Sequence, residues 1–357
     1  MHEKELMKWL ERNNLLSIVK NHYRYFKNLL IKGLNIKKDQ EILILGDWGS
    51  HGHRLAPIIC GAYYLCALNL GYKVNVIMQG PKTRSETASD EIINGFSEFK
   101  EGNIVLMAFS NRPGGFGKLG KSWRRLCYSR KHRFISTGSL GGLENKDIYI
   151  ITRALNVNYD MLKNTASKIK KTLDLGRKIN ITTEAGTNIT ADITGCKSIA
   201  VDGDYTGSNR GGNMPAGEVY IPPITGSVNG KIVIDGSSRN DYGTIIIEEP
   251  IKLTVKRSQI IRIEGGREAR LLGKTLKNAR ELARNPSNVT KISEIGIGIN
   301  PNIEIVGSMV VDEKAFNTAH IAIGSNYWFG GDIITFLHLD QVMRNPTIII
   351  DGKRLEY

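Results

Sequence analysis

The stretch from residue 291 to residue 351 contains several short apolar runs in which branched residues stand at every second position. A period of two is that of a β-strand, whose successive side chains point to opposite faces of a sheet. In the run 294–299 the isoleucines fall on one face, and Glu294 falls on the other with Gly296 and Gly298. The stretch therefore predicts a sheet with one apolar face and one face that carries glycines and ionisable groups.

Four such runs each place ionisable residues opposite their branched residues, and these residues are Glu218, Glu294, His320, His338 and Asp340. Three carboxylates and two imidazoles suit Zn, Co, Mn or Fe. Glycine in a strand leaves room for a group to approach the backbone. Three protein ligands suffice for one catalytic ion, so five favour two ions about 3.5–4 Å apart. The alternative is that the histidines are hydrogen-bonded core residues and the carboxylates line an exposed sheet face.

The segments around these residues resemble the M29 family of metallopeptidases, the aminopeptidase T-like enzymes. The resembling segments are 180–195, 213–223, 293–301, 312–327 and 338–340. The resemblance implies a homodimeric metallo-aminopeptidase, a hydrolase that releases N-terminal amino acids from peptide substrates with two divalent metal ions (Zn, Co or Mn). It implies that the metal ligands are Glu218, Glu294, His320, His338 and Asp340. It also implies that Tyr327 lies near the scissile carbonyl and that Glu313 is a further acidic residue of the site.

The expected peptidase mechanism uses the two ions to lower the pKa of a shared water toward about 7. Glu313 carries its proton to the leaving amine, and Tyr327 donates a hydrogen bond to the developing oxyanion. A different reaction class uses the same residues, because His320, His338 and Asp340 also form a two-histidine, one-carboxylate set for Fe(II) and O₂. Ring-cleaving dioxygenases of M29-like fold resemble this family. The two further carboxylates favour the hydrolase, since a single iron ion does not need them.

The length of 357 residues predicts two domains. Residues 1–176 are expected to form an α/β domain with an open parallel sheet, because apolar strand runs alternate with helical patterns. Its expected strands are 41–47, 73–78, 104–109 and 147–152, and a helix over 154–176 closes it. Residues 177–357 are expected to form a β-rich, mostly antiparallel catalytic domain that binds the metals, with one inserted helix over 267–284.

The net charge of +14 raises the alternative of a basic nucleic-acid-binding protein, with the most basic patch at residues 118–133. No nucleic-acid-binding motif accompanies that charge, so lysine-rich solvated faces are preferred. Gly115–Ser122 matches the phosphate-loop pattern but lacks the expected strand and helix context. No apolar run is long enough for a membrane span, and the four cysteines show no pairing pattern, so a cytoplasmic protein is expected.

Overall fold

The computed structural model describes residues 2–83, 86–120, 123–207 and 211–357, and its contacts divide the chain into two compact units. The first unit comprises Met1–Tyr159 and Gly203–Ala216, and the second comprises Asp160–Asp202 and Gly217–Tyr357. Helix α7 (Tyr159–Leu175) thus belongs almost entirely to the second unit, whereas the expected boundary at residue 176 follows it. The segment Gly203–Ala216 belongs to the first unit, which the sequence did not predict.

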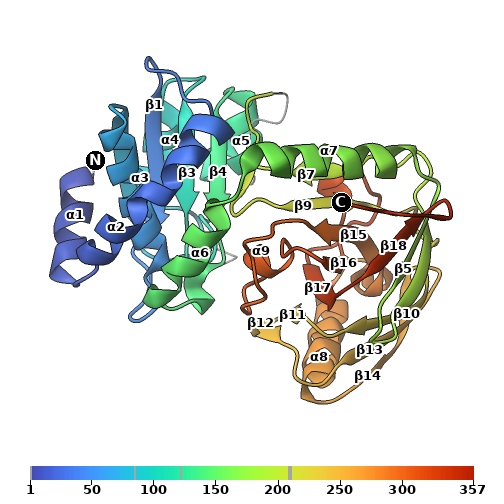
Figure 1. Ribbon diagram of the computed structural model, residues 1–357. Helices are drawn as coiled ribbons and strands as arrows, with labels where there is room; N and C mark the ends of the chain where they lie inside the picture. The colour runs from blue at the N-terminus through green and yellow to red at the C-terminus, as the bar shows by residue number, and fades with distance from the viewer. Residues whose placement is uncertain (1, 84–85, 121–122, 208–210) are drawn as a thin grey trace. The chain divides into compact units, whose positions relative to one another are not determined.

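The first unit is built on a parallel sheet with the strand order β2-β1-β3-β4-β8 among the described residues. Its strands are β1 (Glu41–Asp47), β2 (Lys73–Gln79), β3 (Ile104–Ala108), β4 (Arg133–Thr137) and β8 (Gly211–Asn213). Helices α3 (Leu55–Asn69), α4 (Asp90–Glu98) and α5 (Trp123–Ser129) accompany it (Figure 1). Leu43 and Leu45 pack with Phe96 of α4, whereas Gly46 lies against Cys60 of α3. Strand β1 is apolar on both faces because helices cover both.

The expectation of a strand over residues 147–152 is wrong, because this segment belongs to helix α6 (Ile148–Leu155). Ile148, Ile151 and Leu155 are spaced for one face of a helix and are buried there. A short apolar run fits either period, and the tertiary packing decides between them. Before β1, the chain forms the helices α1 (Glu3–Arg12) and α2 (Leu16–His22). Short helices over Tyr23–Phe26 and Leu29–Gly33 follow them.

The second unit contains two seven-stranded sheets in the part of the chain that the structure describes, and the strand pairs within both are antiparallel. One has the order β14-β13-β10-β6-β5-β18-β19 and the other the order β12-β11-β17-β16-β15-β9-β7. The strands of the first are β5 (Lys178–Thr182), β6 (Asn188–Asp192), β10 (Asn229–Ile234), β13 (Ile251–Lys256), β14 (Gln259–Glu264), β18 (Thr347–Ile350) and β19 (Lys353–Arg354). Those of the second are β7 (Ile199–Val201), β9 (Glu218–Ile221), β11 (Ser237–Asn240), β12 (Gly243–Ile246), β15 (Ile292–Gly298), β16 (Thr318–Gly324) and β17 (His338–Arg344).

Helix α8 (Arg267–Leu282) and the short helix α9 (Met309–Asp312) complete this unit. Helix α7 runs beside the β7 and β9 edge of the second sheet, where Asp174 accepts hydrogen bonds from Ser198 (Figure 1). The predicted fold class, a parallel α/β part followed by an antiparallel part, is confirmed. Within the described ranges, no helix has the length and apolar character that a membrane span requires.

Candidate metal centre

One face of the second sheet carries all five predicted ligands, because directly paired residues of neighbouring strands share a face. His320 on β16 pairs with Gly296 on β15, and Gly298 pairs with Glu218 on β9. Ala322 pairs with Glu294 on one side and with Asp340 on the other, which places these two carboxylates in one row. The isoleucines of β15 and β16 occupy the opposite, buried face. The alternation predicted from the sequence is therefore present, and four adjacent strands bring the ionisable groups together.

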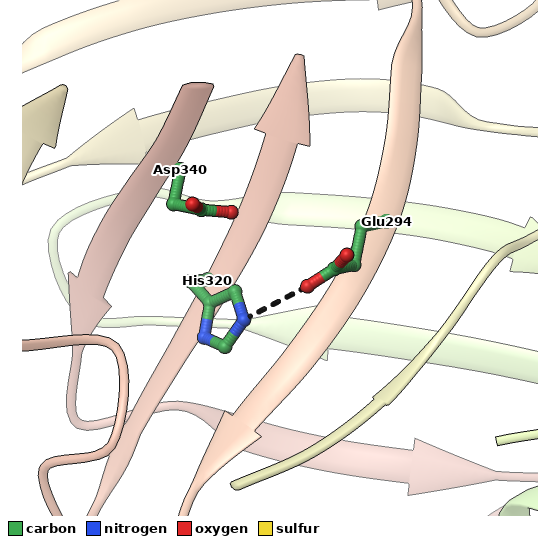
Figure 2. Close-up of side chains that lie close together, drawn as sticks. All are labelled: Glu294, His320 and Asp340. Carbon is green, nitrogen blue, oxygen red and sulfur yellow. Dashed lines mark hydrogen bonds and ion pairs between the residues drawn. The ribbon is translucent and has the colours of Figure 1, made fainter. Parts of the chain in front are cut away.

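The side chains lie within ion-pair distance of one another. The Nε2 atom of His320 lies 3.2 Å from Glu294 Oε1 and 3.6 Å from Glu218 Oε2. The Nε2 atom of His338 lies 3.1 Å from Asp340 Oδ1 and 3.6 Å from Glu294 Oε2. Figure 2 shows Glu294, His320 and Asp340 projecting toward one another from neighbouring strands, with His320 bonded to Glu294. The structure thus brings together the residues predicted as ligands; their role as ligands stays a prediction.

Two backbone features hold the imidazoles in place. A Cβ atom at Gly296 would lie 2.0 Å from His320 Nε2, so the ring occupies space that only glycine leaves open. The Nδ1–H of His338 donates a 2.8 Å hydrogen bond to the carbonyl oxygen of Ser325. This bond directs His338 Nε2 toward the carboxylates, which is how metal-binding histidines are commonly oriented.

The carboxylates control the pKa values of the two imidazoles. Burial lowers the pKa of His320, but the Glu294 and Glu218 carboxylates outweigh it and raise the pKa to about 9. Burial also lowers the pKa of His338, whereas Asp340 and Glu294 raise it to about 10. Burial raises the pKa of Asp340, and the positive charge of His338 reverses this and brings it to about 2. Near pH 7 the cluster without a metal ion therefore holds protons on its imidazoles, and a bound ion would displace them.

Lys314 is a part of this cluster that the sequence reasoning missed. Its side chain is fully buried, and its Nζ atom lies 3.1 Å from Glu218 Oε1 and contacts Glu313 Oε1. Burial lowers the pKa of Lys314, but the Glu218 and Glu313 carboxylates more than compensate and raise it. Burial raises the pKa of Glu313 to about 8, against the opposing effect of Lys314. A buried ammonium ion needs such pairing, so these carboxylates have a cation of their own.

The residues of the cluster fit a divalent metal ion. Glu294, His320 and Asp340 each offer a ligand atom, and these atoms lie within 4.8 Å of one another. Four buried carboxylates and one buried ammonium ion lie here among the described residues, so the cluster carries an excess of negative charge once its imidazoles lose their protons. The Nδ1 atom of His320 is buried and has no hydrogen-bond partner within the described ranges. An ion bound by imidazole and carboxylate would balance the charge, and this donor set is one that such ions prefer.

The metal-free protein is expected to lose stability as the pH rises above about 6.5, the pKa of histidine in an unfolded chain. The folded-state values for His320 and His338 are higher, so the protonated imidazoles favour folding below 6.5. This contribution disappears as the pH passes through about 9 and then about 10. Urea unfolding with a chelator at pH 6.5, 8 and 10 measures the effect. His320→Gln should flatten the profile, and a wild-type profile that stays flat would contradict the expectation.

The other predicted catalytic residue, Tyr327, lies in the short helix η7 (Tyr327–Phe329) after β16, with its side chain 58% exposed. The ring that contacts the cluster is that of the next residue, Trp328, whose centroid lies 4.8 Å from that of His338. The centroid of the Phe329 ring lies 6.1 Å from that of His338 and 5.2 Å from that of Tyr220. Two aromatic side chains therefore contact the His338 ring.

The basic patch of residues 118–133 is partly used for internal contacts of the first unit. Arg124 donates a hydrogen bond to Asn213, Arg130 donates one to the Phe99 carbonyl, and Arg133 donates one to the Leu34 carbonyl. Such bonds give these cations a structural role. Lys121 and Ser122, which would act in a phosphate loop, lie outside the described residues.

Fold and cluster together define a two-unit protein with an imidazole–carboxylate centre on an antiparallel sheet. Residues 149–355 match the family NicX, 2,5-dihydroxypyridine 5,6-dioxygenase, and the chain belongs to this family. The 2,5-dihydroxypyridine 5,6-dioxygenase of Pseudomonas putida KT2440 is 27% identical over 196 residues, which are 51% of this chain and 53% of that protein. The match thus spans about half the length of that relative.

Two solved structures share the fold over nearly the whole chain. The structure of 2,5-dihydroxypyridine dioxygenase from Pseudomonas putida KT2440 has a TM-score of 0.73 at 18% identity and covers 94% of this chain and 95% of its own. Wild-type AmpT from Thermus thermophilus has a TM-score of 0.64 at 14% identity, and the match covers 94% of this chain and 97% of AmpT. The resemblance to aminopeptidase T-like enzymes is therefore confirmed at the level of the fold.

The prediction that the protein is an aminopeptidase, a hydrolase of peptide bonds, is wrong, because the family match and the curated relative are those of a ring-cleaving dioxygenase. The prediction assumed that Glu218 and Glu294 needed a second metal ion. In the structure one oxygen of Glu218 contacts Lys314, so an extra carboxylate does not require an extra ion. The oxyanion role of Tyr327 was expected for peptide hydrolysis, and its place among the site residues stays a prediction.

Proposed function

We propose that this protein is an iron(II)-dependent dioxygenase that opens a dihydroxylated pyridine ring, with 2,5-dihydroxypyridine as the first substrate to test. The single observation that carries the proposal is the family match over residues 149–355, which include all five cluster residues and Lys314. The alternative reading that the sequence offered, Fe(II) chemistry on the same residues, thereby becomes the preferred one.

His320, His338 and Asp340 are the residues that would hold the ion, since two imidazoles and one carboxylate form the set that non-haem iron oxygenases use. An iron ion held there would supply the redox chemistry that a reaction of dioxygen with an electron-rich ring requires. In the protein without an ion, His320 Nε2 lies 3.2 Å from Glu294, and this nitrogen would have to give up its proton to bind the ion. The Ser325 carbonyl supports His338 in another way, because it bonds Nδ1 and leaves Nε2 available for the ion.

The surroundings of His338 favour an aromatic substrate. Trp328 is 55% exposed and meets the His338 ring at an angle of 66°, so part of its indole surface is open to a ligand. Phe336 is 40% exposed in the same loop before β17. Aromatic rings contact one another favourably in edge-to-face and offset arrangements, which would orient a pyridine ring beside the centre.

The test is oxygen uptake by protein reconstituted anaerobically with Fe(II). Addition of 2,5-dihydroxypyridine should start uptake with one O₂ consumed for each ring opened, and both atoms of ¹⁸O₂ should enter the product. An aminoacyl anilide serves as the matched hydrolase substrate and should remain intact. A chelator should abolish uptake, and readdition of Fe(II) should restore it. Ring loss that does not depend on iron, or cleavage of the anilide, would contradict the proposal. The homodimer expected from the sequence stays a prediction.

A further inference from the structure

Lys314 is the only lysine among the described residues whose side chain is fully buried beside the centre. Lys314 follows helix α9, and its backbone is fixed by hydrogen bonds with Val311 and Asn300. Its side chain is 0% exposed and ends between two carboxylates, those of Glu218 and Glu313. No surface role or solvent contact explains a lysine in this position, so its charge must serve the cluster.

The Glu218 carboxylate is shared between the lysine and the centre. Its Oε1 atom lies 3.1 Å from Lys314 Nζ, and its Oε2 atom lies 3.6 Å from His320 Nε2. A carboxylate that bridges two metal ions has the same arrangement, with one oxygen toward each cation. Here the ammonium ion occupies the position of one of those cations.

A second divalent ion beside the first would need oxygen ligands on this side of the cluster. Glu218 and Glu313 are the carboxylates there, and both contact Lys314. The ion would also lie next to a buried positive charge, where little water screens their repulsion. An ammonium ion donates hydrogen bonds but offers no vacant position for a water molecule, so it cannot perform the second ion's part in hydrolysis.

We propose that the Lys314 ammonium ion takes the place of a second metal ion and thereby limits the centre to one. This inference concerns the number of ions and rests on the proposed function only in assuming that the cluster binds a metal. It explains how the chain keeps the extra carboxylates of a dinuclear site while it belongs to a family of dioxygenases. It makes Lys314 a positioning residue, since it acts on the centre through Glu218.

The experiment counts ions on the full chain, with Mn(II) as the probe. At saturation wild type should bind one Mn(II) per chain, measured by mass spectrometry of the metal and by equilibrium dialysis. Its electron paramagnetic resonance spectrum should be that of an isolated Mn(II). Lys314→Met should raise the number to two and add the signature of exchange-coupled ions. Lys314→Arg keeps the positive charge and should bind one Mn(II) per chain. The double variant Lys314→Met with Glu218→Gln should again bind one Mn(II) per chain.

Two bound ions in wild type would overturn the inference, whether or not any variant folds. A folded Lys314→Met protein that still binds one ion would overturn it as well, and so would a Lys314→Arg protein that binds two. Oxygen uptake keeps the two proposals apart. One ion per wild-type chain without ring-dependent oxygen uptake contradicts the proposed function alone. Ring opening by a protein whose Lys314→Met variant binds only one ion contradicts the role of Lys314 alone.

Discussion

His320→Ala is expected to weaken Fe(II) binding strongly and to abolish oxygen uptake with the ring substrate. The His320 side chain is fully buried and its Nε2 atom faces Glu294 at 3.2 Å and Glu218 at 3.6 Å. No other imidazole described in the structure can take this place, since His338 extends from the next strand and is directed by Ser325. The remaining groups would be one imidazole and carboxylates, a set that binds divalent ions more weakly and without the iron-oxygenase geometry.

The same substitution should destabilise the metal-free protein by about 3–5 kcal/mol, because it leaves buried carboxylates without their positive partner. Isothermal titration with Fe(II) and urea unfolding measure the two effects separately. His22→Ala is the matched control, because that ring bonds the carbonyl of Ile18 and lies 6.3 Å from the Tyr25 ring between centroids, so its loss should leave metal binding unchanged. Normal metal affinity in His320→Ala would remove this residue from the centre.

Gly296→Ala is the second substitution with a large expected effect, although it adds only one methyl group. The new Cβ atom would lie 2.0 Å from Nε2 and 2.2 Å from Cε1 of His320, closer than any real contact. The ring must move, and it has little room because the side chain is fully buried beneath Glu294 and Glu218. Overpacking of this kind costs about 1–3 kcal/mol of folding free energy.

Metal affinity should fall at least about tenfold in Gly296→Ala, as it does when the support of a metal-binding histidine is disturbed. Gly273→Ala is the matched control. It lies in helix α8 with nothing within 4 Å of the added methyl group, so it should bind metal normally. It should also be slightly more stable, by roughly 0.8–1.0 kcal/mol, because alanine favours a helix more than glycine does. Unchanged Fe(II) affinity in Gly296→Ala would mean that His320 does not hold the ion from its observed position.

Much of the fold followed from local patterns. Strand β1 has its predicted bounds, because its apolar residues face helices on both sides and turn residues follow it. The run at Ile148 was misread because four to six apolar residues satisfy both the helical and the strand period. The short strand β8 carries two glycines and pairs with β4 far from it in sequence, so no local signal indicated that it returns to the first unit.

The function was misassigned for a related reason. Glutamates such as Glu218 and Glu294 can bind a metal ion both in a hydrolase and in a dioxygenase. The sequence alone does not show which positively charged group lies next to them. Lys314 lies in the segment 312–327 but was not considered as a site residue. Its neighbours in the sequence gave no sign that its side chain is buried. The decisive contact joins Lys314 to Glu218, 96 positions earlier in the chain. A pattern read within single strands cannot detect it.

The sequence by itself determined which side chains share a face, because alternation along a strand is a local property of the backbone. It therefore identified Glu218, Glu294, His320, His338 and Asp340 as one group. Only the tertiary structure decided which strands are neighbours, how close the charges lie, and that a buried lysine stands among them. These depend on long-range packing, in which burial and distance set the strength of each charge interaction.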